Sequence, residues 1–168
     1  MSAAAAKKKD GGGGQAVEGP HSPRFRNRQA FREYDISEKV EAGLKLLGTE
    51  VKSLRDGNCQ IEDAFARVER GEVLLYNADI AIYPQAVGVL QHEPRRTRKC
   101  LLHKAQISTL LRLTQQKGMT IVPLALYFRN GYAKVELGLG RGKQSADRRQ
   151  DLKEKQMRRD IDRAMRRH

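Results

Sequence analysis

The sequence contains no tryptophan, few aromatic residues, two cysteines and four histidines. Cys59 and Cys100 lie far apart and form no CxxC pair, so no disulfide framework is indicated and a reduced cytoplasmic protein is expected. None of the histidines stands at metal-ligand spacing from a cysteine or another histidine. We therefore expect neither a metal site nor a cofactor.

Long apolar runs are also missing. No stretch approaches the roughly 20 apolar residues of a membrane span, and no apolar segment follows the lysines at 7–9, as a secretory signal would require. The hydrolase patterns GxSxG and HExxH are absent. Residues 138–143 approach a phosphate-binding loop, but Leu137 and Gln144 break that motif, which leaves a glycine hinge as the interpretation. We expect a protein that is not an enzyme, with no membrane and no small-molecule substrate.

Positive charge is what the sequence has in excess. It holds 33 Lys and Arg against 20 Asp and Glu, for a formal net charge of +13. Such proteins favour polyanionic partners, because neutralising phosphates releases condensed counterions. Residues 31–90 nevertheless carry a net −4, and the positive charge gathers in residues 24–30, 91–104 and 141–168. This distribution predicts nucleic-acid contacts through an N-terminal arm, one loop and a C-terminal tail.

The distribution of apolar residues predicts three segments. They are a disordered N-terminal extension over residues 1–26, a folded body over 27–140 and a basic tail over 141–168. In the body, period-two alternation at 132–137 and a β-rich run at 120–128 predict a hairpin around Asn130-Gly131. A second hairpin is predicted at 64–68 and 73–76 around Arg70-Gly71. Further strands are expected at 31–36, 43–47 and 80–83, and Pro123 is expected at an edge or a bulge.

Two helices are predicted between these strands. Residues 49–55 form a short helix that stops near Gly57, and residues 102–117 form a longer one that Gly118 closes. In the longer helix Ile107, Leu110, Leu111 and Thr114 share a face that we expect to turn inward. We predict a mainly β fold: a small antiparallel barrel of the OB type, with two or three short helices and a basic, conditionally helical tail.

The tail has the pattern of a marginal helix. Three acid–base pairs at i, i+4 (151/155, 154/158 and 162/166) follow Asp147, which can cap the helix. Its apolar stripe is narrow: Met157, Ile161, Ala164 and Met165. Such a segment becomes helical when a partner supplies contacts. The alternative is a helix docked on the body through this stripe.

The densest positive segment is 92–99, which we interpret as a loop directly before a helix. It contains Arg96, Arg98 and Lys99, and arginine forks match phosphate oxygens and stack on bases. A second contact is offered by Arg24, Arg26 and Arg28 in the arm. Tyr132 and Lys134 would place a stacking ring beside a cation on an exposed strand face.

At these residues the sequence resembles the SsrA-binding protein (SmpB) family. The resemblance runs through successive blocks from Asn27 to the tail, of which residues 48–55 (GTEVKSLR) are the most specific. Further blocks are 27–30, 41–44, 63–65, 71–73, 92–94, 96–99, 101–104, 121–124, 133–135, 140–143 and 147–149. Ala146 departs from the family, whose members usually place Tyr or His there.

The resemblance implies an OB-like body that binds the tRNA-like part of tmRNA during trans-translation. It also implies a tail that acts in the decoding centre and the empty mRNA channel of a stalled ribosome. By position, the tmRNA-facing residues would be Asn27, Glu41, the 96–99 segment with Arg96, Arg98 and Lys99, Leu101 and Lys134, joined by Arg28 and Tyr132 from the charge and strand patterns. The ribosome-acting residues would be Gly142, Lys143, Asp147, Arg148 and Arg149, and Ile161 is added by the helix pattern of the tail.

Two other functions fit parts of the sequence. A ribosomal or initiation-type OB protein would share the basic composition, but its partner would be ribosomal RNA. A small nuclease would need an acid cluster or a metal set, whereas Glu33, Asp35, Glu38 and Glu41 fit the solvated face of a strand.

Overall fold

The computed structural model describes residues 23–86, 91–116 and 118–144, together with 153, 156–161, 163 and 165. The expected disorder of residues 1–22 lies outside this range. Phe25 and Arg26 already form a strand, so the folded body begins before residue 27. At the other end the last strand runs to Gly142, two residues into the segment assigned to the tail.

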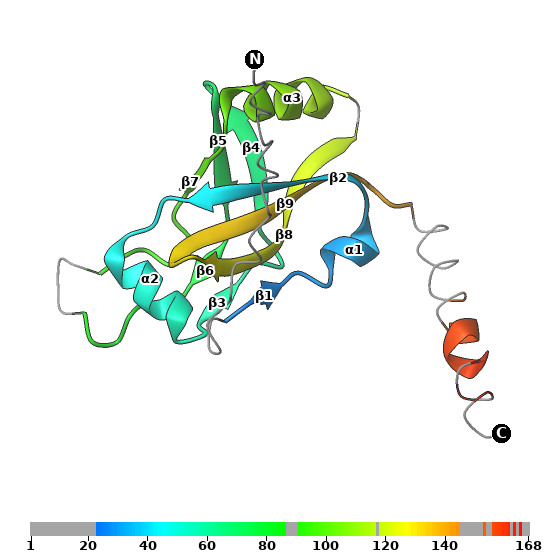
Figure 1. Cartoon of the computed structure of the whole chain (residues 1–168), viewed down its shortest axis with the longest axis horizontal. Coiled ribbons are helices and arrows are strands. Elements are labelled where there is room, and N and C mark those ends of the chain that lie inside the picture. The colour runs from blue at the N-terminus through cyan, green and yellow to red at the C-terminus, as the bar shows by residue number, and fades with distance from the viewer. Residues whose placement is uncertain are drawn as a thin grey trace, which may run out of the picture.

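The body is built mainly from one large antiparallel sheet (Figure 1). The strand order is β1-β8-β4-β5-β7-β2-β9, and β8 also pairs with β9. The prediction of a mainly β, antiparallel fold with few short helices is confirmed. The strands are β1 (Phe25–Arg26), β2 (Tyr34–Leu44), β4 (Phe65–Glu69), β5 (Glu72–Tyr76), β7 (Arg98–Leu101), β8 (Met119–Arg129) and β9 (Tyr132–Gly142), with a small second sheet of β3 (Cys59–Gln60) and β6 (Asp79–Ile80).

Both predicted hairpins are present. β8 and β9 join through Asn130 (φ 52°) and Gly131 (φ 80°), and Arg129 pairs with Tyr132 across the turn. β4 and β5 join in the same way through Arg70 (φ 50°) and Gly71 (φ 76°). Two successive positive φ angles match the right-handed twist of the flanking strands, which is why an Xaa-Gly pair marks these turns. A register shift next to Pro123 confirms the expected bulge.

The region before Leu44 was predicted wrongly. The structure has a short helix, α1 (Ala30–Glu33), followed by the single strand β2, where two separate strands were expected at 31–36 and 43–47. The side chain of Asn27 accepts a hydrogen bond from the Ala30 N–H at 2.8 Å and so favours a helical turn. A bulge between Ile36 and Glu38 then breaks the alternation that would have marked one continuous strand. The strand predicted at 80–83 is also wrong beyond Ile80.

The two longer helices lie where predicted, with shorter bounds for the second. α2 (Gly48–Arg55) is followed by Gly57 at φ 85°, and α3 (Lys104–Thr114) precedes Gly118 at φ 82°. Leu110 is buried in α3, but Leu111 is 43% exposed, so its expected inward position is wrong. Leu113 packs against the core instead. Among the described residues, no helix combines the length and apolarity needed to cross a membrane.

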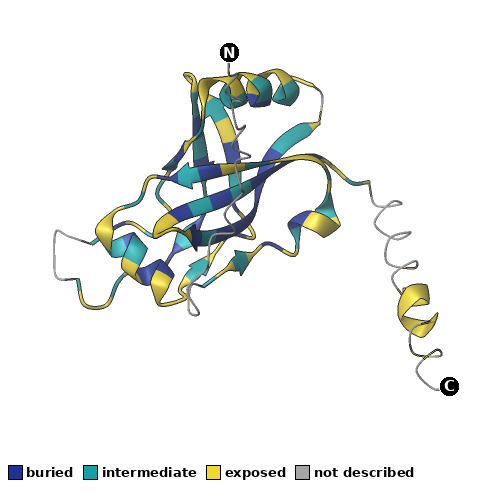
Figure 2. Cartoon of the chain, in the orientation of Figure 1, coloured by how far each residue is buried: buried dark blue, intermediate teal, exposed yellow. Residues whose placement is uncertain are grey.

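The apolar core lies on the inner face of the sheet, where the buried residues of the strands gather (Figure 2). Gly138 and Gly140 are part of this packing. A Cβ at Gly138 would lie 2.8 Å from the Leu124 side chain, and one at Gly140 would lie 2.5 Å from the backbone oxygen of Asp35. These glycines therefore allow close approach between β9 and its neighbours. The interpretation of this segment as a hinge is wrong for both positions.

Candidate RNA-binding surface

The outer face of β9 carries the first group of candidate residues. Ala133, Val135 and Leu137 point into the core, so Tyr132 and Lys134 point outward. The strand register then sets their neighbours: Lys134 lies opposite Tyr127 of β8 on one side and Gly43 of β2 on the other, and Gly43 lies opposite Leu101 of β7. Lys134 and Leu101, which are far apart in sequence, therefore share one row across four strands. This row, together with Tyr132 two residues along β9 and Glu41 two residues along β2, is the surface that we call the outer row.

Glu41 is held in the outer row by three neighbours. Its carboxylate accepts hydrogen bonds from the Tyr127 hydroxyl and, at 3.2 Å, from Arg129, and it lies 3.9 Å from Lys134 Nζ. The hydrogen bond from Tyr127 holds the pKa of Glu41 below its ordinary value; burial opposes this, and Arg129 and Lys134 lower the pKa further. Burial, and then the bond to Glu41, raise the pKa of Tyr127 to about 12. Glu41 is therefore a fixed, ionised acceptor that also orients its neighbours.

The outer row also presents exposed groups. Tyr132 is 73% exposed and Leu101 is 52% exposed. The Lys134 side chain keeps 31% of its surface. An uncovered phenol ring, an uncovered aliphatic side chain and a cation lie beside a fixed carboxylate, and these groups can stack on bases and contact ribose or phosphate.

The segment 92–99 differs from its predicted form. It does not lead directly into a helix, because β7 intervenes and carries Arg98 and Lys99. Each cation here has an acidic partner: Arg95 pairs with Asp79 at 3.0 Å, Arg96 and Arg98 pair with Glu50, and Lys99 pairs with Glu72. The densest cationic segment in the sequence is thus largely neutralised by acids of the body.

Arg98 is a structural residue in this fold. Its side chain is fully buried and donates to Glu50 Oε1 at 2.8 Å, to the backbone oxygens of Pro94 at 2.7 Å and Arg96 at 3.0 Å, and to that of Ala78. Burial lowers the pKa of the Arg98 guanidinium, and the Glu50 carboxylate opposes that change. A guanidinium with no exposed surface cannot reach a phosphate, so Arg98 is withdrawn from the expected RNA contacts.

Glu50 is the residue that the sequence reasoning missed. It is fully buried and also accepts hydrogen bonds from Arg96 Nε at 2.8 Å and from the Leu47 N–H at 2.6 Å. Burial raises the pKa of Glu50, but the bonds from Arg96 and Leu47 and the charges of both arginines outweigh it and leave the pKa lowered. The sequence did contain a signal for this role: Glu50 lies in the first turn of the helix predicted at 49–55, a position from which a glutamate can cap the backbone.

Asn27 is also structural, contrary to its expected RNA-facing position. Its side chain is 1% exposed. The amide donates to the backbone oxygens of Ile61 at 3.1 Å and Glu62 at 3.4 Å, while its oxygen accepts from the Ala30 N–H. These bonds use the hydrogen-bonding groups of the side chain and fix the arm against the body. The neighbouring Arg28 is exposed.

The base of the tail contacts α1. Gly142 ends β9 opposite Tyr34, and the Lys143 N–H donates to the Glu33 backbone oxygen at 2.7 Å. Asp147, Arg148, Arg149 and Ala146 lie outside the described residues.

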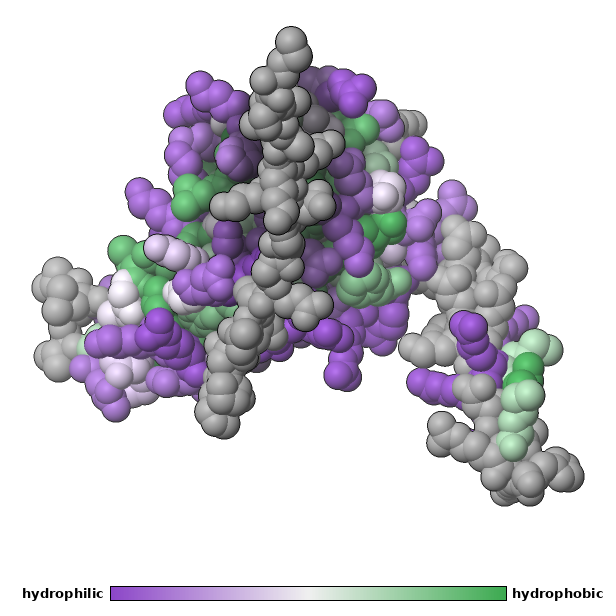
Figure 3. Space-filling view, in the orientation of Figure 1, coloured by the Kyte–Doolittle hydropathy of each residue, from purple (hydrophilic) through white to green (hydrophobic). Residues whose placement is uncertain are grey.

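Residues 156–161 are helical. Their apolar stripe faces solvent (Figure 3), with Met157 68%, Ile161 52% and Met165 75% exposed. The described residues of the stripe are therefore exposed rather than docked on the body, contrary to the alternative raised by the sequence.

Among the described residues, no group of three or more His, Cys, Asp and Glu side chains could hold a metal ion. Burial raises the pKa of both cysteine thiols to about 12. Thiols with so high a pKa are poor nucleophiles at neutral pH.

Comparison with known proteins identifies the family of this chain. The family described as SmpB protein matches residues 24–167. An SsrA-binding protein of Pelotomaculum thermopropionicum is 52% identical over 139 residues, which cover 83% of this chain and 90% of that protein. The SsrA-binding protein of Bacillus subtilis is 48% identical over 141 residues, covering 84% and 90%.

A solved structure described as "tmRNA-SmpB: a journey to the center of the bacterial ribosome" contains a similar chain. It is 50% identical, with a TM-score of 0.62, and the match covers 73% of this chain and 86% of that one. The chain described here therefore belongs to the SmpB family of SsrA-binding proteins.

Proposed function

We propose that this protein binds the tRNA-like domain of tmRNA and positions it on stalled ribosomes during trans-translation. The outer row is the surface that carries this proposal. Tyr132 offers a stacking ring, Lys134 a cation, Leu101 an apolar contact and Glu41 a fixed acceptor for ribose or base groups. The names of its relatives, and the complex described for its structural neighbour, point to the same RNA and to the ribosome.

The proposal gives the body and the tail different tasks. The body, residues 27–140 together with β1, holds the tmRNA. The tail acts in the decoding centre and the mRNA channel through Gly142, Lys143, Asp147, Arg148, Arg149 and Ile161. The protein works in the cytoplasm by binding and positioning, and it performs no catalytic step.

Arg96 and Lys99 remain in the proposal as secondary contacts. Their side chains keep 27% and 40% of their surface while paired with Glu50 and Glu72. Both form close pairs with their acids, whereas Lys134 Nζ lies 3.9 Å from Glu41, a carboxylate that Arg129 also contacts, so we expect each to contribute less than Lys134.

A binding titration with the tRNA-like domain of tmRNA tests the outer row. Replacing Tyr132 and Lys134 by alanine should weaken binding at least about tenfold, because one stacked base contributes about 1–3 kcal/mol and the loss of the Lys134 cation adds to it. The matched control replaces Tyr83 and Lys52, a tyrosine of the segment after β6 and a lysine of α2 that lie in contact (5.2 Å from Nζ to the ring centre). Equal affinity of the two double variants would remove the outer row from the RNA site.

The RNA that co-purifies with the full chain separates this proposal from its rival. A discrete tmRNA band supports it, whereas ribosomal RNA alone would favour a ribosomal or initiation-type protein. Removal of residues 145–168 leaves β9 intact and should spare tmRNA binding while abolishing peptide tagging.

A further inference from the structure

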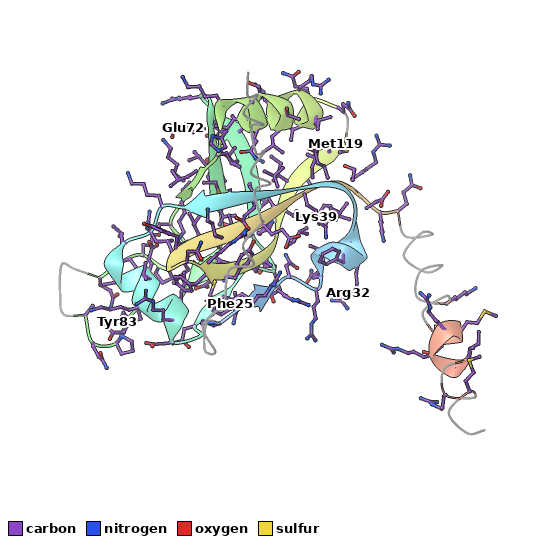
Figure 4. The ribbon with its side chains drawn as sticks, in the orientation of Figure 1. Phe25, Arg32, Lys39, Glu72, Tyr83 and Met119 are labelled. Atoms are coloured by element: carbon purple, nitrogen blue, oxygen red, sulfur yellow. The ribbon has the colours of Figure 1, made fainter. Side chains whose placement is uncertain are left out.

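Four arginines line one cleft at the edge of the body. The cleft has a volume of about 450 Å³ and lies between the arm, α1 and the turn at Glu62. Arg32 extends from α1 toward solvent on the side where β1 lies (Figure 4). The lining residues are Arg24, Arg26, Arg28, Gln29, Arg32 and Glu62; four arginines and one glutamate give this cleft, the arginine cleft, a net formal charge of +3.

The charge of the arginine cleft is poorly compensated. Within the described residues, Arg26, Arg28 and Arg32 have no acidic partner within 4.0 Å, and all three are exposed. Arg24 lies 3.8 Å from Glu136, at the outer limit of an ion pair. By composition the segment 92–99 has the densest positive charge, but each of its cations is paired with an acid. The arginine cleft therefore has more positive charge available for a ligand than that segment. Unpaired arginines gathered in a concave surface repel one another, and an anion relieves that repulsion.

The backbone that presents these arginines is fixed. Asn27 lies between Arg26 and Arg28 and joins the arm to the body through its buried side chain and through its N–H, which donates to Leu124 O at 2.9 Å. Arg26 itself stands in β1, paired with Ala125 of β8. A ligand in the cleft therefore orders side chains only, which lowers the entropic cost of binding.

The arginine cleft adjoins the outer row without being part of it. Arg24 stacks on the Tyr127 ring at 4.9 Å and marks the boundary between the two. On the other side of the cleft, α1 carries Arg32, and the backbone oxygen of Glu33 in α1 accepts the hydrogen bond from the Lys143 N–H. The cleft thus lies between the surface proposed for tmRNA and the start of the segment proposed for the ribosome.

We propose that the arginine cleft binds the phosphodiester backbone of RNA, as a second site separate from the outer row. Guanidinium groups bind phosphate oxygens through paired, charge-assisted hydrogen bonds. Three unpaired arginines on a fixed backbone can hold successive phosphates without reading base sequence. This inference rests on the proposed function only in taking RNA as the partner.

Salt-dependent binding of the full-length protein tests the cleft. The test variant carries Arg28→Gln and Arg32→Gln; the matched control carries Arg67→Gln and Arg112→Gln, which removes the same charge from β4 and α3. Both variants are titrated with the tRNA-like domain of tmRNA and, separately, with ribosomes. The test variant should lose about two units of the slope of log affinity against log salt and bind at least about tenfold more weakly at 0.1 M salt, in one or both titrations. The control should keep the wild-type slope.

The two titrations identify the source of the phosphates. A loss of affinity and of salt slope with the tRNA-like domain assigns the cleft to tmRNA. The same loss with ribosomes alone assigns it to ribosomal RNA. If the test variant matches the control in both titrations, the cleft is not an RNA site.

The experiments distinguish refutation of the cleft as an RNA site from refutation of the proposed function. Reduced tmRNA binding by the Tyr132/Lys134 variant with an unaffected cleft variant refutes only the cleft. Absence of binding by the unmodified protein to either RNA refutes both. The Arg28→Lys, Arg32→Lys variant should recover most of the salt dependence of the affinity, because the slope of log affinity against log salt reports how many phosphates the protein neutralises.

Discussion

Replacing Arg98 by methionine separates a structural role for this residue from an RNA contact. Methionine keeps much of the side-chain volume but leaves Glu50 buried with one arginine partner, and it leaves the backbone oxygens of Ala78 and Pro94 without that donor. Removing one partner of a buried ion pair typically costs about 3–5 kcal/mol of unfolding free energy. The control is Arg95→Met, which breaks the surface pair with Asp79 and should cost less than about 1 kcal/mol.

Urea unfolding followed by circular dichroism measures this difference. The free energy gap between the two variants should narrow in acid. Because the pKa of Glu50 is lowered in the folded state, its contribution is present above the ordinary carboxyl pKa and disappears as the pH falls through the folded value. An Arg98→Met protein as stable as Arg95→Met, with reduced tmRNA affinity, would refute the structural reading and restore Arg98 to the RNA site.

The remaining predictions concern the outer row and the tail. Because the pKa of Tyr127 is raised to about 12, the unfolded chain releases a proton between about pH 10 and 12 that the folded protein keeps, so unfolding free energy should fall with rising pH in that window. Glu41→Gln should lower the pKa of Tyr127, and a spectrophotometric tyrosine titration in which this variant matches the original protein would contradict the assigned bond. Ile161→Pro interrupts the tail helix and should impair peptide tagging while leaving tmRNA binding intact; full tagging activity in a reconstituted assay would show that the helix is dispensable.

Local sequence patterns predicted the parts of the fold that local physics controls. Asn130-Gly131 and Arg70-Gly71 specify their turns because the φ angles of two adjacent residues suffice. The helix α1 and the continuity of β2 were missed, because the bond from the Ala30 N–H to the Asn27 side chain and the bulge after Ile36 depend on contacts with the rest of the body. The same limit applies to Gly138 and Gly140, which resemble a hinge until the neighbouring strands are placed.

The sequence by itself determined the family, the antiparallel β class and the need for a polyanionic partner, because these follow from ordered motifs, alternation and net charge. Only the tertiary structure decided which charges remain available. Glu50 and Glu72 come from elements distant in sequence and neutralise the cations at 96–99, whereas in the described part of the chain Arg26, Arg28 and Arg32 have no such partners. The interaction between charges depends on their separation in space and on burial, and neither quantity is encoded in the local order of residues.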